Sequence, residues 1–330
     1  MWLPWEGRAF RSPDGRAVLV TGAGSGIGRS AAVRLATSGF TVFAGCFNER
    51  ERDAFPLPDD AGARARLHLV VMDVTSADSL AAAAAVVRGA TGGALWGVIN
   101  CAGVSMSFGP LEHLTVANVK INFEVNVVGT INVLQAFLPM LRAAEGRVVN
   151  ISSYNGFAPF PFYAGYNMSK FAVEGLTETL RLELQAAAPK MRVVLVQPGA
   201  IFPTEMNGPK SGKHFNAKME PFKEAMAPVY GEIDAVKIFS ANDDNLPAIH
   251  PDDFSKVLEG AISAARPWCT YSVPNNVWLV RVIKGLLPDA WWHAFNYALV
   301  KTLWKTGVSL FRGEALPAPP KARSSSPKRK

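Results

Sequence analysis

Cysteine is scarce in this chain of 330 residues: the three present, Cys46, Cys101 and Cys269, lie far apart and form no Cys-x-x-Cys pair. This argues against a disulfide framework and a zinc site, and it favours a reducing compartment. The chain also lacks an early apolar run long enough for a signal peptide, because Glu6 interrupts the first apolar residues. We therefore expect a cytoplasmic protein with no bound metal.

An excess of charge of one sign is nearly absent from the body of the chain. The formal net charge is +7, but five of the positive charges lie in residues 321–330. A nearly neutral body argues against a nucleic-acid-binding surface, so we expect no nucleic-acid partner. Residues 313–330 are rich in Pro, Ser, Lys and Arg, and we interpret them as a disordered basic tail.

One hydroxyl-rich stretch lies between a strand-like run at 146–152 and a helix-like run at 171–184. Tyr166 and Lys170 are four residues apart at the start of that helix, so one turn places the phenol and the ammonium on the same face. A nearby cation lowers the pKa of a phenol from about 10 towards neutrality. Ser153 lies thirteen residues before Tyr166, where its hydroxyl can hold a substrate oxygen. Tyr-x-x-x-Lys also occurs by chance in many helices, so alone it is weak.

A glycine-rich turn joins an apolar strand, residues 16–21, to a helix-like run. Gly22, Gly26 and Gly28 have the spacing Gly-x-x-x-Gly-x-Gly, which lets backbone amides and a helix N-terminus approach a pyrophosphate. Methyltransferases and plain structural turns use similar glycine patterns, so this turn alone does not identify a cofactor.

The carboxyl end of the second strand-like run, residues 40–46, normally indicates which cofactor is bound. An acid there hydrogen-bonds the ribose of NAD, whereas an arginine accommodates the extra phosphate of NADP. Cys46 and Phe47 occupy this place and meet neither criterion. Asn48 and Arg50 follow closely, and we interpret them as part of a solvated turn.

Apolar strand-like runs continue at 67–75 and 95–103, with an alanine-rich helix at 79–87 between them. This alternation predicts an α/β fold with a doubly wound parallel sheet, covered by helices on both faces and binding ligands beyond the carboxyl ends of its strands. Asp73 and Asn100 lie at two such ends. The carboxylate can accept an adenine amino proton there, and the amide can brace the glycine-rich turn.

Asn126 is a polar residue inside an apolar helix predicted over 121–137. It either pairs with a neighbouring backbone group or fixes a helix distortion and a water beside Lys170, which gives the proton a route to solvent.

The second half of the chain begins with a strand that ends in Pro198-Gly199. Residues 200–248 lack periodicity and are long enough for a lid over a substrate. A helix from Pro251 to about residue 265 and a strand over 269–273 follow.

The segment 277–304 is unusually aromatic, and Pro288 splits it into two predicted helices that are too short and too charged to span a bilayer. These helices can line an apolar substrate entrance, rest on a membrane surface or form a subunit contact, and we weigh the three equally.

Several motifs occur together in one order and spacing. They are Thr21-Gly22-Ala-Gly-Ser-Gly26-Ile-Gly28, Asp73, Asn100-Cys-Ala-Gly103, Asn126, Ser153, Tyr166-x-x-x-Lys170 and Pro198-Gly199. In combination they are highly specific, and the chain resembles the classical short-chain dehydrogenase/reductase family. The resemblance implies a Rossmann-type three-layer catalytic domain over 15–275, with an extension at 1–14 and C-terminal aromatic helices at 276–312.

The resemblance also implies a role for each matching residue. Tyr166 is then the acid/base, and Lys170 lowers its pKa and binds the nicotinamide ribose. Ser153 holds the substrate oxygen, and Asn126 supports a proton relay. The cofactor-binding residues implied are Gly22, Ser25, Gly26, Ile27, Gly28, Asp73, Val74, Asn100, Ala102, Gly103, Tyr166, Lys170, Pro198 and Gly199.

Two positions depart from the family pattern. Cys101 stands where the family usually has a second asparagine, a change that a small residue allows. The hydroxyl expected five residues after Pro198 is displaced, because Pro203 stands there and Thr204 follows it.

Within the family, the chain looks like the branch of retinol, hydroxysteroid and 3-hydroxybutyrate dehydrogenases, which mostly uses NAD, so we favour NAD over NADP. We take Ser153, Asn155, Phe157 and Tyr163 as substrate-binding residues; the aromatic character of this stretch favours a lipophilic alcohol or ketone over a short 3-hydroxy acid. The phenylalanines there fit a protein core equally well.

The expected function is NAD(P)-dependent hydride transfer between the nicotinamide and an alcohol or carbonyl carbon. A catalytically silent dinucleotide-binding sensor or scaffold is the alternative, and the intact set of Asn, Ser, Tyr and Lys argues against it. The family resemblance also implies a homo-oligomer formed through the helices that carry Asn126 and Tyr166.

Overall fold

The protein is described by a computed structural model that covers residues 11–201, 203, 204, 206, 220–222, 224, 249–273 and 275–305. Its centre is a seven-stranded parallel sheet in the order β3-β2-β1-β4-β5-β6-β7. The strands are β1 (Ala17–Val20), β2 (Thr41–Cys46), β3 (Leu67–Val71), β4 (Gly97–Asn100), β5 (Arg147–Ile151), β6 (Arg192–Pro198) and β7 (Thr270–Val273). The order reverses between β1 and β4, which is the switch point of a doubly wound fold.

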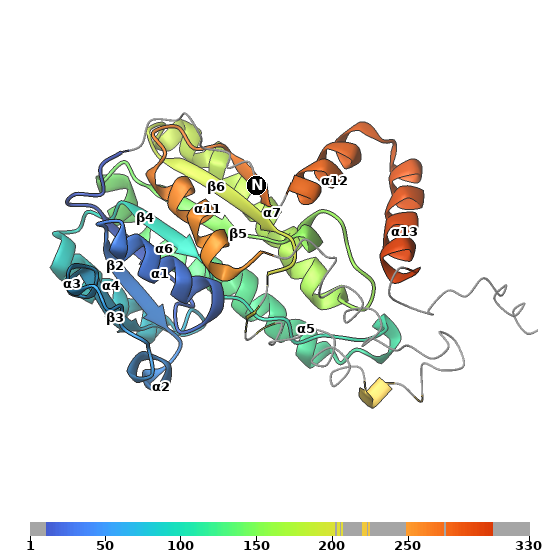
Figure 1. Ribbon diagram of the computed structural model, residues 1–330, viewed down its shortest axis with the longest axis horizontal. Helices are drawn as coiled ribbons and strands as arrows, with labels where there is room; N and C mark the ends of the chain where they lie inside the picture. The colour runs from blue at the N-terminus through green and yellow to red at the C-terminus, as the bar shows by residue number, and fades with distance from the viewer. Residues whose placement is uncertain are drawn as a thin grey trace, which may run out of the picture.

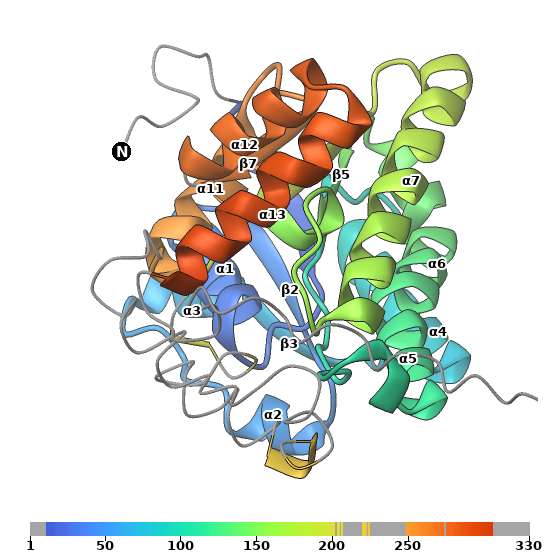
Figure 2. The ribbon, with the colours of Figure 1, turned by 90° about the vertical axis from the view of Figure 1, so that its right-hand side faces the viewer.

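Helices cover both faces of the sheet, as Figures 1 and 2 show. One layer contains α1 (Gly26–Thr37), α3 (Ala61–Arg66) and α11 (Pro251–Ser263), and the other contains α4 (Ala77–Thr91), α6 (Gly129–Ala143) and α7 (Ala164–Ala187). The predicted three-layer α/β fold is confirmed.

The unbroken apolar strands follow from this double covering. In β1, Val18 and Val20 belong to the core beneath α1 and α11, whereas Ala17 and Leu19 belong to the core beneath α4, α6 and α7. Successive side chains of a strand point to opposite faces, so a strand covered on both sides must be apolar at every position.

The helix that carries Asn126 is longer than predicted and is distorted at that residue. It runs from α5 (Val116–Phe123) through a π-helical turn, η2 (Glu124–Val128), into α6. Within the described residues, the stretch Val116–Ala143 is the one helix long and apolar enough to cross a membrane. Its inner side chains Val133 and Phe137 pack in the core against the sheet.

The segment after β2 differs from the solvated turn that the sequence predicted. Asn48 accepts a hydrogen bond from the Glu51 amide at 2.9 Å and thereby caps the short helix α2 (Glu49–Asp53). Helix α4 also extends beyond the predicted 79–87, because Ser76 caps its start and Gly92, at a φ of 61°, ends it.

Two helices follow β7, namely α12 (Asn275–Leu286) and α13 (Asp289–Lys305). Pro288 lies between them, as predicted, and the pair stands out from the sheet in Figure 1. Val277 of α12 and Trp292 of α13 pack against Phe157 and Ala158. Short helical turns complete the described structure: η1 (Leu111–His113), η3 (Tyr154–Gly156) and η4 (Glu220–Phe222).

The predicted lid over 200–248 lies almost wholly outside the described residues. The basic tail at 313–330 and most of the N-terminal extension also lie outside them.

Candidate active site

A cleft of about 640 Å³ lies at the carboxyl ends of the strands and spans the switch point between β1 and β4. Ligands of open α/β sheets bind at this location. The predicted site residues that line the cleft are Gly22, Ser25, Gly26, Ile27, Gly28, Asp73, Val74, Ala102, Gly103, Ser153, Tyr166, Lys170, Pro198 and Gly199.

The glycine-rich turn is packed too closely for side chains. A Cβ placed on Gly22 would lie 2.7 Å from the Cα of Ala102, and one on Gly28 would lie 2.8 Å from the carbonyl carbon of Gly22. Gly22 and Gly26 also have φ values of +60° and +51°, a region that favours glycine. This packing leaves the N-terminus of α1 open to the cleft, where its free amides suit a pyrophosphate.

The turn after β4 is held by Thr21, to which the sequence reasoning gave no role of its own. Its Oγ1 accepts hydrogen bonds from the amides of Cys101 at 3.0 Å and Ala102 at 2.9 Å. Asn100, predicted to brace this region, does not line the cleft, and its amide nitrogen donates to Asn150 Oδ1 at 2.8 Å. The hydroxyl directly after β1 therefore braces the turn that faces the glycine-rich loop.

Asp73 lies in the cleft beside Val74, beyond the end of β3. Its Oδ1 accepts hydrogen bonds from the amide of Thr75 at 2.9 Å and from the Thr75 hydroxyl at 2.7 Å. These bonds fix the orientation of the carboxylate at the edge of the cleft, which is suitable for holding an adenine amino group.

Ser153, Tyr166 and Lys170 are brought together at the inner end of the cleft. Ser153 hydrogen-bonds the Tyr166 hydroxyl. The Nζ of Lys170 lies 5.6 Å from the centre of the Tyr166 ring and donates to the carbonyl oxygen of Ile151 at 3.0 Å. The loop after β5 and the first two turns of α7 thus supply a hydroxyl, a phenol and an ammonium to one place.

Burial controls how these groups titrate. It raises the pKa of Tyr166 to about 12, against the opposing effect of the Ser153 hydrogen bond. It also lowers the pKa of Lys170 to about 8. Desolvation of the buried phenolate is thus the largest influence on the Tyr166 pKa in the protein without its cofactor, and the lowering by Lys170 that the family resemblance implied stays a prediction.

Asn126 lies behind this group rather than in the cleft lining. Its Oδ1 accepts from the Val104 amide at 2.8 Å, and its Nδ2 donates to the Val104 carbonyl and to Ser169 Oγ, both at 2.9 Å. The side chain occurs at the π-helical turn, and it pairs with a neighbouring backbone segment.

Comparison with known proteins decides the family. A family model described as short chain dehydrogenase matches residues 16–214. The chain belongs to this family. It is 34% identical over 280 residues to D-beta-hydroxybutyrate dehydrogenase, mitochondrial, of Rattus norvegicus, covering 82% of this chain and 80% of that one. It is 32% identical over 275 residues to retinol dehydrogenase 16 of Homo sapiens, covering 82% and 84%.

Solved structures agree on the fold of this short-chain dehydrogenase. NAD+-bound xylitol dehydrogenase superposes with a TM-score of 0.65 at 24% identity, covering 80% of this chain and 99% of that one. The family model and the curated relatives, rather than this likeness in fold, show that the chain is an NAD(P)-dependent oxidoreductase of the family. The cleft, which runs from the glycine-rich turn to Tyr166, fits a nicotinamide dinucleotide.

The predicted substrate residues of this dehydrogenase lie outside the cleft lining, except for Ser153. Asn155 donates to Asn167 Oδ1 at 2.8 Å, and Tyr163 packs at the edge of the Phe108 ring. Phe157 is 3% exposed and packs with Val277 and Trp292. Phe157 is therefore a core residue, the alternative that the sequence left open.

Several cleft residues of the dehydrogenase were not predicted. Glu51 lines the cleft. The one sequence feature that could have indicated its position is Asn48, three residues earlier, because an asparagine followed three residues later by a glutamate is typical of a helix start. Thr204, displaced from the family position, nevertheless lines the cleft, and its Cβ lies 3.6 Å from a Cβ placed on Gly26. Other lining residues that the sequence did not single out include Val104, Met106 and Ile201.

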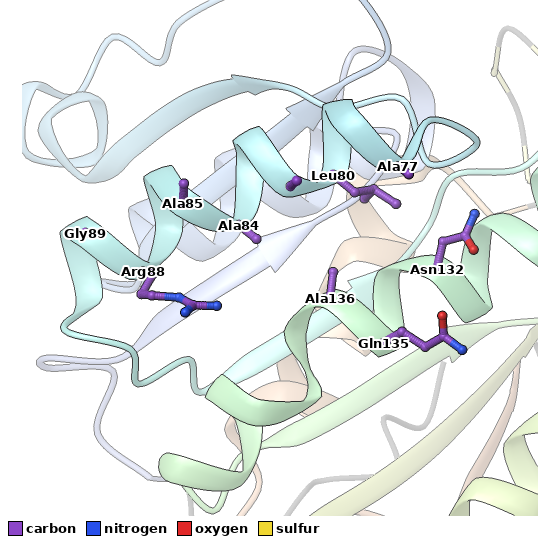
Figure 3. Close-up of a pocket in the computed structure, with 10 residues that line it drawn as sticks. Ala77, Leu80, Ala84, Ala85, Arg88, Gly89, Asn132, Gln135 and Ala136 are labelled. Carbon is purple, nitrogen blue, oxygen red and sulfur yellow. The ribbon is translucent and has the colours of Figure 1, made fainter.

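A second hollow, of about 750 Å³, lies between α4 and α6 (Figure 3). Half of its lining residues are alanines, and its polar side chains are those of Arg88, Asn132 and Gln135. It contains none of the candidate catalytic or cofactor-binding residues, so the cleft at the carboxyl ends of the strands remains the candidate active site.

Proposed function

We propose that this dehydrogenase transfers a hydride between NAD(H) and a lipophilic alcohol or ketone. The observation that supports the proposal best is the meeting of Ser153, Tyr166 and Lys170 at the inner end of a cleft lined by the glycine-rich turn. A bound nicotinamide supplies the hydride acceptor or donor at its C4 carbon.

The protein's own groups handle the substrate oxygen and its proton. In reduction, the Tyr166 hydroxyl donates its proton to the oxygen while the carbonyl carbon gains the hydride. In oxidation, the tyrosinate takes the hydroxyl proton while the carbinol carbon loses the hydride. Ser153 donates a hydrogen bond to the same oxygen and stabilises its developing charge, and Lys170 holds the nicotinamide ribose.

The cleft composition favours a lipophilic substrate over a short 3-hydroxy acid. Val104, Met106 and Ile201 line the same cleft as the catalytic group. Among the described lining residues, Lys170 is the only cation, and it donates to Ile151 beside Tyr166. A hydroxy acid needs a second cation for its carboxylate, because a buried unpaired charge is costly. The related retinol dehydrogenase bears the name of a lipophilic alcohol.

Glu51 supports a preference for NAD over NADP. Its Oε2 accepts from the Phe47 amide at 2.9 Å, and a Cβ placed on Gly24 would lie 2.7 Å from its carboxyl carbon. The carboxylate therefore lies between the end of β2 and the glycine-rich turn, where the adenosine ribose of the cofactor belongs. A carboxylate there accepts from ribose hydroxyls and repels a 2′-phosphate.

The cofactor proposal is tested by titrating the protein with NADH and NADPH. We expect NADH to bind at least about tenfold more tightly, a difference of about 1.4 kcal/mol. Glu51→Gln should bring the dissociation constants of NADH and NADPH closer together, because NADH would bind more weakly and NADPH more tightly. Glu49→Gln is the matched control, because Glu49 lies on the same short helix but does not line the cleft. Equal binding of both cofactors by the wild type would refute the preference.

The reaction is tested with a panel of retinoid, steroid and short hydroxy-acid substrates. Tyr166→Phe should reduce turnover of the preferred substrate by at least about a hundredfold. Tyr154→Phe is the control, because the buried Tyr154 hydroxyl has no hydrogen-bond partner among the described residues. Full turnover in Tyr166→Phe would refute the proposed mechanism, and turnover of hydroxy acids alone would refute the substrate class.

We also propose that α12 and α13 rest on a membrane surface. Trp278, Leu286 and Trp291 are exposed on these helices, and Trp291 is 68% exposed. Aromatic and aliphatic side chains of this kind insert into the interface of a bilayer. Flotation with lipid vesicles tests the proposal, and Trp291→Ser with Leu286→Ser should abolish binding without changing NADH affinity. Vesicle binding that survives both changes would refute it.

A homo-oligomer through α5 and α7 is the second association that we propose. Val116 and Ile121 of α5 and Met168, Phe171 and Leu182 of α7 are exposed large apolar side chains. Light scattering should report an oligomer that Phe171→Glu with Leu182→Glu dissociates. A monomeric wild type would refute this proposal.

A further inference from the structure

A buried carboxylate lies beneath the turn that carries Ser153 and has no part in the chemistry proposed above. Glu174 is one helical turn after Lys170 on α7, and its side chain is only 16% exposed. Its Oε1 accepts hydrogen bonds from Ser152 Oγ at 3.0 Å and from Gln197 Nε2 at 2.6 Å. A buried carboxylate needs such partners, because desolvation raises its pKa towards the neutral form.

The turn is packed directly on this carboxylate. A Cβ placed on Gly156 would lie 2.5 Å from Glu174 Oε1, so only glycine allows the turn to approach this closely. Ser152 immediately precedes Ser153, and its hydroxyl lies 3.4 Å from the carbonyl oxygen of Lys170. Glu174 therefore ties the end of β5 to the turn of α7 that carries Lys170.

Helix α12 reaches the other oxygen of the same carboxylate. Arg281 Nη1 lies 3.6 Å from Glu174 Oε2. One turn further along α12, Lys284 Nζ donates to the carbonyl oxygen of Phe157 at 2.7 Å. The Arg281 guanidinium also lies 5.7 Å from the centre of the Phe157 ring. Two cations of α12 thus hold the carboxylate and the end of the Ser153 turn together.

Strands β6 and β7 complete the network. Gln197, the donor to Glu174, accepts from the Ser272 hydroxyl at 2.7 Å through its own Oε1. The carboxylate therefore joins four elements of the fold, namely the end of β5, helix α7, strand β6 and helix α12. Networks of this kind fix one arrangement, because each partner would otherwise be a buried polar group without a hydrogen bond.

We propose that Glu174 is a positioning residue that couples helix α12 to the Ser153 turn and holds the Ser153 hydroxyl at the Tyr166 hydroxyl. Helix α12 is then part of the framework that holds the active-site residues in place. This inference rests on the proposed function, because positioning is measured through hydride transfer. A displacement of a catalytic group by about 1 Å can reduce the rate of the reaction by about a hundredfold.

The test compares Glu174→Gln with Glu178→Gln in the full chain. Glu178 lies one turn further along α7, and its side chain is 53% exposed and pairs with Arg181, so its removal should leave the rate unchanged. We expect Glu174→Gln to lower kcat by about tenfold to a hundredfold while the dissociation constant for NADH stays within about twofold of the wild type. If Glu174 only stabilised the fold, its replacement would lower both kcat and the affinity for NADH.

The coupling to α12 is tested by Arg281→Gln, by its combination with Glu174→Gln and by Arg281→Lys. Arg281→Gln should lower kcat, and the kcat of the double variant should be no lower than that of Glu174→Gln alone. Arg281→Lys should keep most of the wild-type kcat. Wild-type kcat in Glu174→Gln, additive losses in the double variant, or equal losses of kcat and NADH affinity would each overturn the proposal. If Tyr166→Phe abolishes turnover and Glu174→Gln leaves it intact, this inference alone is refuted. If the wild type shows no turnover, the proposed function is refuted.

Discussion

Gly28→Ala tests how closely the glycine-rich turn is packed against α1. A Cβ at position 28 would lie 2.8 Å from the carbonyl carbon of Gly22 and nearer still to its oxygen, whereas ordinary contacts begin at 3.4 Å. The neighbouring atoms are backbone and cannot rotate away as a side chain can. The turn must therefore move by at least about 0.6 Å, the difference between these two distances.

The expected loss of stability combines two opposing effects. Overpacking of a site without free space costs up to about 3 kcal/mol. Replacing glycine by alanine in a helix returns about 1 kcal/mol. The net destabilisation is therefore about 2 kcal/mol, which lowers the melting temperature by about 4 to 8 °C. The displaced turn carries the amides offered to the pyrophosphate, so NADH affinity should fall by at least about tenfold.

Gly89→Ala in α4 is the matched control, because a Cβ there would meet no atom within 4 Å. This variant should gain about 1 kcal/mol and bind NADH as the wild type does. Calorimetry and NADH fluorescence titration measure the two quantities. A Gly28→Ala variant with the melting temperature and the NADH affinity of the wild type would refute the reasoning.

The remaining predictions concern buried polar groups. Burial lowers the pKa of Lys170 from 10.5 to about 8, so the buried charge destabilises the folded wild type by its full amount below pH 8. Lys170→Met should therefore be more stable than the wild type in urea unfolding, and this difference should shrink as the pH rises from 8 to 10.5. Burial raises the pKa of Tyr166 to about 12, so kcat/KM for alcohol oxidation should rise with pH between about 7 and 10, and a flat profile would exclude tyrosinate as the base. Asn126→Ala leaves the Val104 amide and carbonyl without their partner, which should cost about 2 to 4 kcal/mol in chemical denaturation, and a cost below about 1 kcal/mol would contradict this account.

The sheet could be predicted because its information is local. A strand covered on both faces is apolar at every position, and each such run was bounded by a glycine or a polar residue. Three of the four catalytic candidates could be found for the same reason, since Tyr166 and Lys170 share one helical turn and Ser153 lies at the end of the preceding strand. Spacing along the chain is enough to bring such residues together.

The roles of other residues depend on partners far along the chain. Phe157 packs with Val277 and Trp292, and nothing near position 157 distinguishes a core phenylalanine from one that faces a substrate. Glu51 turns back to the Phe47 amide only because Asn48 caps a short helix between them. The titration of Tyr166 likewise depends on how many distant segments exclude water from its ring, which spacing does not reveal.

Some polar groups that are costly to bury lie at the carboxyl edge of the sheet, whereas Arg147 is buried at the opposite edge, at the start of β5. At the carboxyl edge, Asn100 Oδ1 is buried without a hydrogen-bond partner among the described residues, and Lys170 is buried with a lowered pKa. Each arrangement costs about 1 to 3 kcal/mol, which a fold selected for stability alone would avoid. Violations of local preference concentrate at functional sites, since there the polar group is needed where it is. Glu174, whose carboxylate is held by Ser152, Gln197 and Arg281 at the carboxyl edge, is a further buried charge beside the cleft, which supports the positioning role proposed for it.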